Sequence, residues 1–101
     1  MRILVLFDLP TLTAAERKAA ARFRKDLIEE GFLMLQESVY CKLALNGTAA
    51  ALVKSRVRRC LPDDGSVLML TITEKQFEAM EICLGGYPEN VVDSDNRLVI
   101  I

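Results

Sequence analysis

One carboxylate in this chain stands where chemistry is common, and the residues used by many other catalytic sites are missing. Asp8 ends a nearly continuous apolar run that begins at Ile3. Such a run is typical of a buried strand. A carboxylate at its last position lies where the sheet meets the loops. The sequence has no histidine, no glycine-rich phosphate loop and no CxxC pattern, so Asp8 is the residue to explain.

Two roles fit Asp8 equally well. A carboxylate is a hard oxygen ligand suited to Mg²⁺, but a single one leaves most of the octahedral shell to water. Two copies of Asp8 that meet near the two-fold axis of a dimer could share one ion and act on a phosphodiester. In the alternative role, Asp8 caps a turn or a helix by accepting hydrogen bonds from the amides that follow it.

Charge is distributed unevenly along the chain. Residues 1–61 carry a net charge of +5 and residues 62–101 carry −6. A solvated helix face explains any single basic residue, but for the set we expect a surface that contacts nucleic-acid phosphates without reading the base sequence. The candidate nucleic-acid-binding residues, all in two predicted helices, are Arg17, Lys18, Arg22, Lys25, Lys54 and Arg58.

Apolar periodicity and turn residues predict the elements that position these side chains. Thr13 and Glu16 form a capping-box pattern, and Gly31 stands where a left-handed helix cap belongs. On the first helix the apolar positions are Ala19, Ala20, Phe23, Leu27 and Ile28, and on the second they are Ala50, Val53, Val57 and Cys60. The predicted strands cover residues 3–8, 32–35, 39–45 and 67–72, and the helices cover about 13–30 and 46–61, with a short turn at 74–77.

The order strand, helix, strand, strand, helix, strand predicts an α+β protein with the ferredoxin-like βαββαβ fold, both helices covering one face of an antiparallel sheet. We expect a single domain over residues 1–101, with its core in about 1–73 and with 74–101 serving dimer or partner contacts. The β-prone residues 97–101 predict an additional C-terminal strand. We place it on the sheet edge of a second subunit in a homodimer, ahead of a return to its own sheet.

Composition narrows the cellular setting. The apolar runs are far shorter than a membrane span, and the first run is no signal peptide, so we expect a cytoplasmic protein without membrane contact. The cysteines are odd in number and widely spaced, which supports neither a disulfide framework nor a zinc site. We expect Cys41, Cys60 and Cys83 to be small buried hydrophobic residues.

Several short motifs occur in the order found in one family. The chain resembles the small CRISPR-associated protein two family, and the similarity, which spans residues 2 to about 77, is strongest to its members from type II systems. The residues that carry it are Arg2–Asp8 with Leu9-Pro10, Glu16-Arg17-Lys18 with Phe23-Arg24, Gly31-Phe32 with Gln36–Tyr40, and Leu70–Phe77.

The resemblance implies a homodimer that partners the CRISPR integrase and holds double-stranded DNA fragments during spacer acquisition. It also implies that Asp8 is a metal ligand, with Mg²⁺ as cofactor, for an endonuclease activity on RNA or DNA. The family's helix arginine falls on Arg17, and its Ser-Val-aromatic motif falls on Ser38 to Tyr40. Phe7 departs from the tyrosine frequent before the aspartate, which puts a role for a phenolic hydroxyl there in doubt.

Three functions follow from these observations. We favour a non-catalytic, DNA-holding subunit of the spacer-acquisition complex. The alternative is a Mg²⁺-dependent endonuclease on RNA or double-stranded DNA, with Asp8 as its catalytic residue and metal ligand in a symmetric pair. A regulatory module that binds a small ligand in the dimer interface is the third, and the basic helices argue against it.

Overall fold

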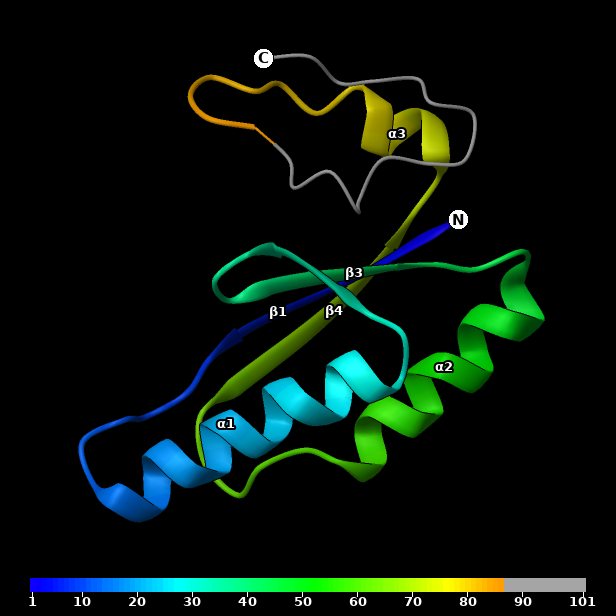
Figure 1. Cartoon of the computed structure of the whole chain (residues 1–101). Coiled ribbons are helices and arrows are strands. Elements are labelled where there is room, and N and C mark those ends of the chain that lie inside the picture. The colour runs from blue at the N-terminus through cyan, green and yellow to red at the C-terminus, as the bar shows by residue number, and fades with distance from the viewer. Residues whose placement is uncertain (87–101) are drawn as a thin grey trace.

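The computed structural model describes residues 1–86, which form an antiparallel four-stranded sheet with two long helices packed on one face (Figure 1). The strand order is β2-β3-β1-β4, as the ferredoxin-like fold requires, and the predicted fold class is confirmed. The predicted strand at residues 97–101 lies outside the described residues. The elements are β1 (Arg2–Asp8), α1 (Ala14–Glu29), β2 (Leu33–Gln36), β3 (Val39–Leu43), α2 (Gly47–Arg59), β4 (Ser66–Ile72) and α3 (Glu74–Glu78).

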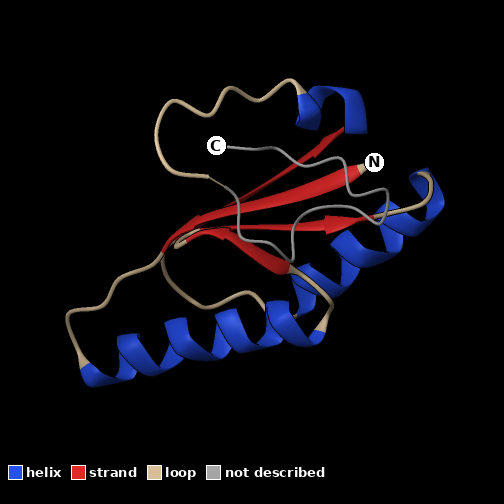
Figure 2. Ribbon diagram, turned by 45° about the horizontal axis from the view of Figure 1, so that its top comes forward, coloured by secondary structure: helices blue, strands red, loops and turns tan. Residues whose placement is uncertain are grey.

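The sheet has two unlike faces, and Figure 2 shows α1 and α2 beneath it and α3 on the opposite side. We call these the helix face and the open face. Alternate residues of β1 point to opposite faces. The main core, between the sheet and the two long helices, therefore includes Ile3, Val5 and Phe7. In it the Phe7 ring meets Phe23 edge-on, with ring centroids 5.2 Å apart. Leu4 instead belongs to a smaller core on the open face.

Both ends of α1 form as the sequence predicts. The Thr13 hydroxyl accepts a 3.0 Å hydrogen bond from the amide of Glu16, whose carboxylate accepts one of 2.9 Å from the Thr13 amide. At the other end Gly31 adopts a φ of 95°, and Lys42 donates its ammonium group to the Glu30 carbonyl. A cation at this position also interacts favourably with the helix dipole.

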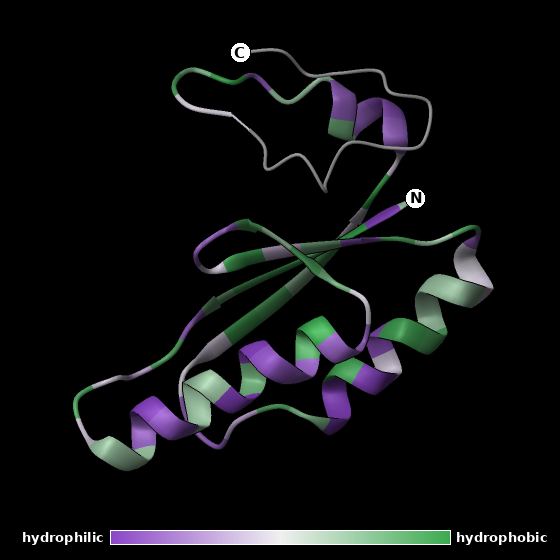
Figure 3. Cartoon of the chain, viewed as in Figure 1, coloured by the Kyte–Doolittle hydropathy of each residue, from purple (hydrophilic) through white to green (hydrophobic). Residues whose placement is uncertain are grey.

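The two long helices are amphipathic, and Figure 3 shows their hydrophilic and hydrophobic segments alternating. The core face of α1 is narrower than predicted. Ala20, Phe23 and Leu27 are buried, whereas Ala19 is exposed and Ile28 is 58% exposed. Within residues 1–86, no helix combines the length and apolarity that a membrane span requires.

Strand β3 is shorter than predicted, ending at Leu43, and buries residues from both faces. Tyr40 joins the main core, while Cys41 is fully buried on the open face. Leu43 and Leu45, which continue the predicted alternation from Val39, are exposed. The burial pattern therefore reflects cover on both faces of the sheet, because α3 reaches the open face.

Helix α3 is fastened to the open face by Arg2, a buried residue that is only 5% exposed. The Arg2 Nε donates to both carboxylate oxygens of Glu74, at 3.1 and 2.9 Å. The guanidinium carbon also lies 4.5 Å from the centroid of the Phe77 ring, within the range of a cation–π contact. Burial raises the pKa of the neighbouring Cys41 thiol, and the Arg2 charge partly opposes that rise.

Candidate functional site

Asp8 is exposed at the last position of β1, where the sheet gives way to the loop that leads into α1. By strand alternation its side chain shares the open face with Leu4 and Leu6. Sequence reasoning placed Asp8 at the end of a strand, and the structure adds that it points away from both long helices.

The carboxylate of Asp8 has no protein partner in the part of the chain that the structure describes. The cap of α1, one of the two roles open to Asp8, is made by Thr13. Arg2 forms an ion pair with Glu74 and Arg56 forms one with Glu30, and neither pair includes Asp8. An exposed acid without a partner is free to bind a ligand from solution.

Two turns flank the end of β1. On one side, the amide of Phe7 donates a 3.0 Å hydrogen bond to the carbonyl of Ser38 in the β2–β3 turn. On the other, Asp8 lies directly opposite Ser66, the first residue of β4. Sequence reasoning missed Ser66, since the register of two strands far apart in the chain is not visible in a single sequence.

A hard cation fits this site only in part. Mg²⁺ favours oxygen ligands and keeps several waters, and it is commonly bound through one or two carboxylates. Asp8 supplies one such oxygen donor. Within the described chain, no three acidic, cysteine or histidine side chains gather as a metal cage. The residues present therefore suit a solvated ion held by Asp8, with further ligands from water or a second copy of the chain.

The candidate phosphate-contacting residues lie on the helices. Lys18, Arg22 and Lys25 are exposed on α1, opposite its buried side. On α2, Arg58 is exposed and Lys54 is half-buried. Helical spacing predicted a shared face for Lys18, Arg22 and Lys25 on one helix, and another for Lys54 and Arg58 on the other. Both helices lie across the sheet from the side chain of Asp8.

Arg17 has a different role from its neighbours. Its Nη1 donates hydrogen bonds to the carbonyls of Thr11 and Leu12, at 3.2 and 3.0 Å. Both carbonyls belong to the loop between Asp8 and α1. Arg17 therefore shapes the loop that follows Asp8, a contact that the helix pattern alone did not reveal.

Arg22 borders a hollow of mixed charge between α1 and α2. Its lining residues are Arg22, Asp26, Glu29, Glu30, Arg56, Arg59 and Cys60. Glu30 and Arg56 form an ion pair of 3.8 Å across it. Burial, with Asp26 and Glu30 nearby, raises the pKa of the Cys60 thiol. The acids in this hollow oppose phosphate binding, so Arg22 is less free than Lys18 or Lys25.

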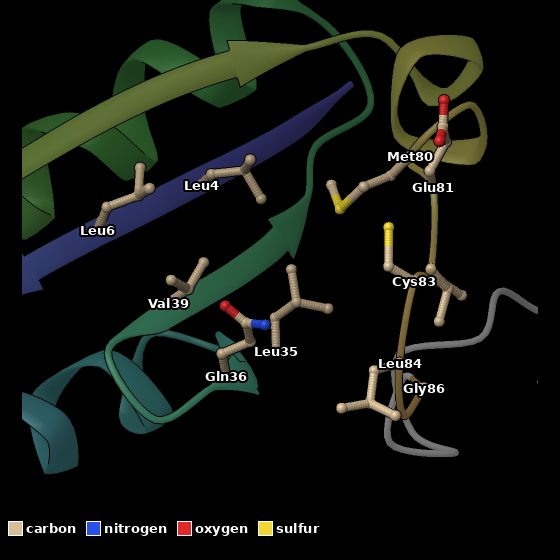
Figure 4. Close-up of a pocket in the computed structure, with 11 residues that line it drawn as sticks. Leu4, Leu6, Leu35, Gln36, Val39, Met80, Glu81, Cys83, Leu84 and Gly86 are labelled. Carbon is tan, nitrogen blue, oxygen red and sulfur yellow. The ribbon is translucent and has the colours of Figure 1, made fainter.

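The open face also carries an apolar hollow of about 480 Å³ (Figure 4). Leu4, Leu6, Leu35 and Val39 form one wall, and Met80 and Leu84 approach from the segment after α3. Contrary to the prediction for the cysteines, Cys83 is exposed beside it, and Cys60 is half-buried, while Cys41 is buried as expected.

The fold agrees with the comparisons to known proteins. The profile of the family "CRISPR associated protein Cas2" matches residues 1–80. The chain belongs to the Cas2 family.

Relatives named CRISPR-associated endoribonuclease Cas2 match along the whole chain. The protein from Streptococcus mutans serotype c is 46% identical over 101 residues, covering 100% of this chain and 93% of its own. Those from Treponema denticola and Ligilactobacillus salivarius are 43% and 42% identical, with full coverage of both chains. A crystal structure of Streptococcus pyogenes Cas2 superposes with a TM-score of 0.62, covering 84% of this chain and 100% of that one, at 23% identity, and so supports the fold.

Proposed function

We propose that this protein is a cytoplasmic, homodimeric and Mg²⁺-dependent endonuclease of CRISPR adaptation, with RNA as its preferred substrate. The observation that carries the proposal is the exposed and unpartnered carboxylate of Asp8 at the end of β1. The name endoribonuclease, which the relatives bear, favours this activity over a purely non-catalytic role and favours RNA over double-stranded DNA as substrate.

A second copy of the chain would complete the site. Leu68 and Leu70 on β4 share the open face with Asp8 and are 63% and 53% exposed. Covering such leucines with the same face of another copy removes apolar surface from water. It also brings the two Asp8 side chains toward a common axis. The pair then offers two carboxylate ligands, a common arrangement for Mg²⁺.

In this proposal the residues of the chain bind and orient, and Asp8 and its copy act as the catalytic carboxylates. Held by the two Asp8 carboxylates, Mg²⁺ would supply Lewis-acid chemistry, namely activation of a water and stabilisation of charge on the phosphoryl oxygens. Arg17 holds the loop after Asp8 through Thr11 and Leu12. These contacts fix the path of the loop that follows the carboxylate.

Removal of the metal tests the proposal. The purified protein should cleave labelled single-stranded RNA in Mg²⁺, lose cleavage in EDTA, and regain it when excess Mg²⁺ is added back, because one or two carboxylates bind the ion reversibly. A duplex DNA of equal length serves as the competing substrate. Cleavage that persists in EDTA would refute a metal-dependent site in this protein. Cleavage that comes from a contaminating nuclease would refute the activity itself.

A second function is favoured by a separate observation, the basic outer side of α1. Lys18 and Lys25 are exposed there and unpaired within the described chain. They suit contacts to phosphates, which give affinity without sequence preference. In this role the homodimer holds a double-stranded DNA fragment and partners the CRISPR integrase, and Lys54 and Arg58 extend the surface onto α2.

Salt dependence tests this second function. Exchanging Lys18 for glutamate should weaken binding to a duplex and should lower the slope of log affinity against log salt by about one for each lost phosphate contact. Lys75→Glu, on α3 and thus beyond the opposite face of the sheet, is the matched control and should bind as the wild type does. Equal losses in the two variants would mean that net charge, and not the α1 surface, sets the affinity.

A further inference from the structure

The first residue of β4 stands next to the candidate catalytic acid. Asp8 and Ser66 are directly opposite each other in the antiparallel ladder between β1 and β4. Directly opposite residues have Cβ atoms about 4.5–5.5 Å apart and point to the same face of the sheet. Both side chains are exposed, so a carboxylate and a hydroxyl face solvent side by side.

The backbone before Ser66 is held closely against Asp8. Gly65 has a φ of +103°, and a Cβ at this position would lie 2.8 Å from the Asp8 carbonyl oxygen and 3.1 Å from the Cα of Leu9. Only a glycine allows so close an approach together with this backbone conformation. The turn thus fixes the position of the Ser66 backbone beside that of Asp8.

A hydroxyl in this position has a defined use at a solvated cation. Mg²⁺ held by one or two carboxylates keeps several of its waters. Each such water needs hydrogen-bond acceptors, and partners outside the first ligand shell orient it. Loss of such a partner typically costs about 10–100-fold in metal affinity. In the described chain, Ser66 is the residue paired across the ladder with Asp8 and therefore the side chain best placed to accept from a metal-bound water.

We propose that Ser66 is a positioning residue of the Asp8 site: its hydroxyl accepts a hydrogen bond from a water of a divalent cation held by the Asp8 carboxylate. The inference rests on the proposed function of Asp8. It assigns a role to a residue of β4, whose place opposite Asp8 follows from the sheet register and the glycine turn.

Mn²⁺ binding tests the proposal, with the free ion measured by electron paramagnetic resonance. The decisive pair is Ser66→Thr and Ser66→Val, because both residues are β-branched and favour strands while only threonine keeps a hydroxyl. We expect Ser66→Val to bind Mn²⁺ about tenfold more weakly than the wild type, and Ser66→Thr to bind within about twofold of it. Thr48→Ala, which removes an exposed hydroxyl from the start of α2, should leave the affinity unchanged.

A kinetic readout separates positioning from a general structural effect. In Ser66→Val, the Mg²⁺ concentration that gives half-maximal RNA cleavage should rise about tenfold, while the rate at saturating Mg²⁺ stays near that of the wild type. A merely structural role would lower the plateau instead. Circular dichroism of each variant establishes that it is folded.

The results distinguish this inference from the function on which it rests. Equal Mn²⁺ affinity in Ser66→Val and Ser66→Thr overturns the role of Ser66 while leaving the Asp8 site in place. Unchanged Mn²⁺ affinity in Asp8→Asn overturns the Asp8 site itself. A tenfold loss in the valine variant alone, together with loss of binding in Asp8→Asn, supports both.

Discussion

Exchanging Asp8 for asparagine should lower Mg²⁺-dependent RNA cleavage by about 100-fold or more, since several kcal/mol of charge stabilisation depend on the bound ion. Asparagine has nearly the shape of aspartate but lacks its negative charge, so the ion loses its ligand while the strand is kept. The Asp8 carboxylate makes no side-chain hydrogen bond or ion pair within the described chain, so folding stability should change by less than about 0.5 kcal/mol. Initial rates of cleavage, with urea unfolding in parallel, measure both quantities.

Asp64→Asn is the matched control for this experiment. Asp64 is also exposed and lies in the turn that precedes β4, but it does not belong to the ladder. It should cleave RNA at the wild-type rate. Duplex binding should be equal in both variants, because the basic residues of α1 lie across the sheet. Full cleavage by Asp8→Asn would show that Asp8 is not the catalytic carboxylate and would overturn the proposed site.

The second large effect concerns the buried ion pair that holds α3. Glu74→Ala should destabilise the fold by about 3 kcal/mol, because it leaves the Arg2 guanidinium unpaired beside Phe77. This figure is at the low end for broken buried pairs, since the side chain of Glu74 is itself 33% exposed and its charge is partly screened. Urea unfolding followed by circular dichroism measures the loss.

Two further variants check the cause. Glu30→Gln breaks the 3.8 Å ion pair with Arg56. Because the side chains of both residues are substantially exposed, the loss in folding stability should be less than about 1 kcal/mol. In the double variant Arg2→Met with Glu74→Leu, no buried charge is left unpaired, and stability should return to within about 1 kcal/mol of the wild type. If the double variant is as unstable as Glu74→Ala, lost packing and not the unpaired charge is responsible.

Local features of the sequence predicted the elements well. The Thr13 and Glu16 pattern predicted the start of α1, and both of its reciprocal hydrogen bonds are present. Gly31 was correctly placed in the left-handed conformation after that helix. These features depend on residues within one or two turns of each other, so a single sequence contains them.

Features that depend on distant pairings could not be predicted in the same way. Arg2 appeared in the sequence as an ordinary basic residue before an apolar run, and its partner Glu74 is 72 positions away. The place of Ser66 opposite Asp8 depends on the register of β4 against β1. Helical spacing grouped Arg22 with Lys18, but it could not show the acids that border Arg22 between the two helices.

The division between the two faces of the sheet bears on how this chain can change over generations. Asp8 lies on the open face and Lys18 lies on the far side of α1, with the main core between them. The Asp8 site and the basic side of α1 consist of different residues. A mutation that abolishes the function of one surface therefore leaves the other surface under separate selection. A lineage that needs only DNA holding would tolerate drift at Asp8, and one that needs only cleavage would tolerate drift at Lys18.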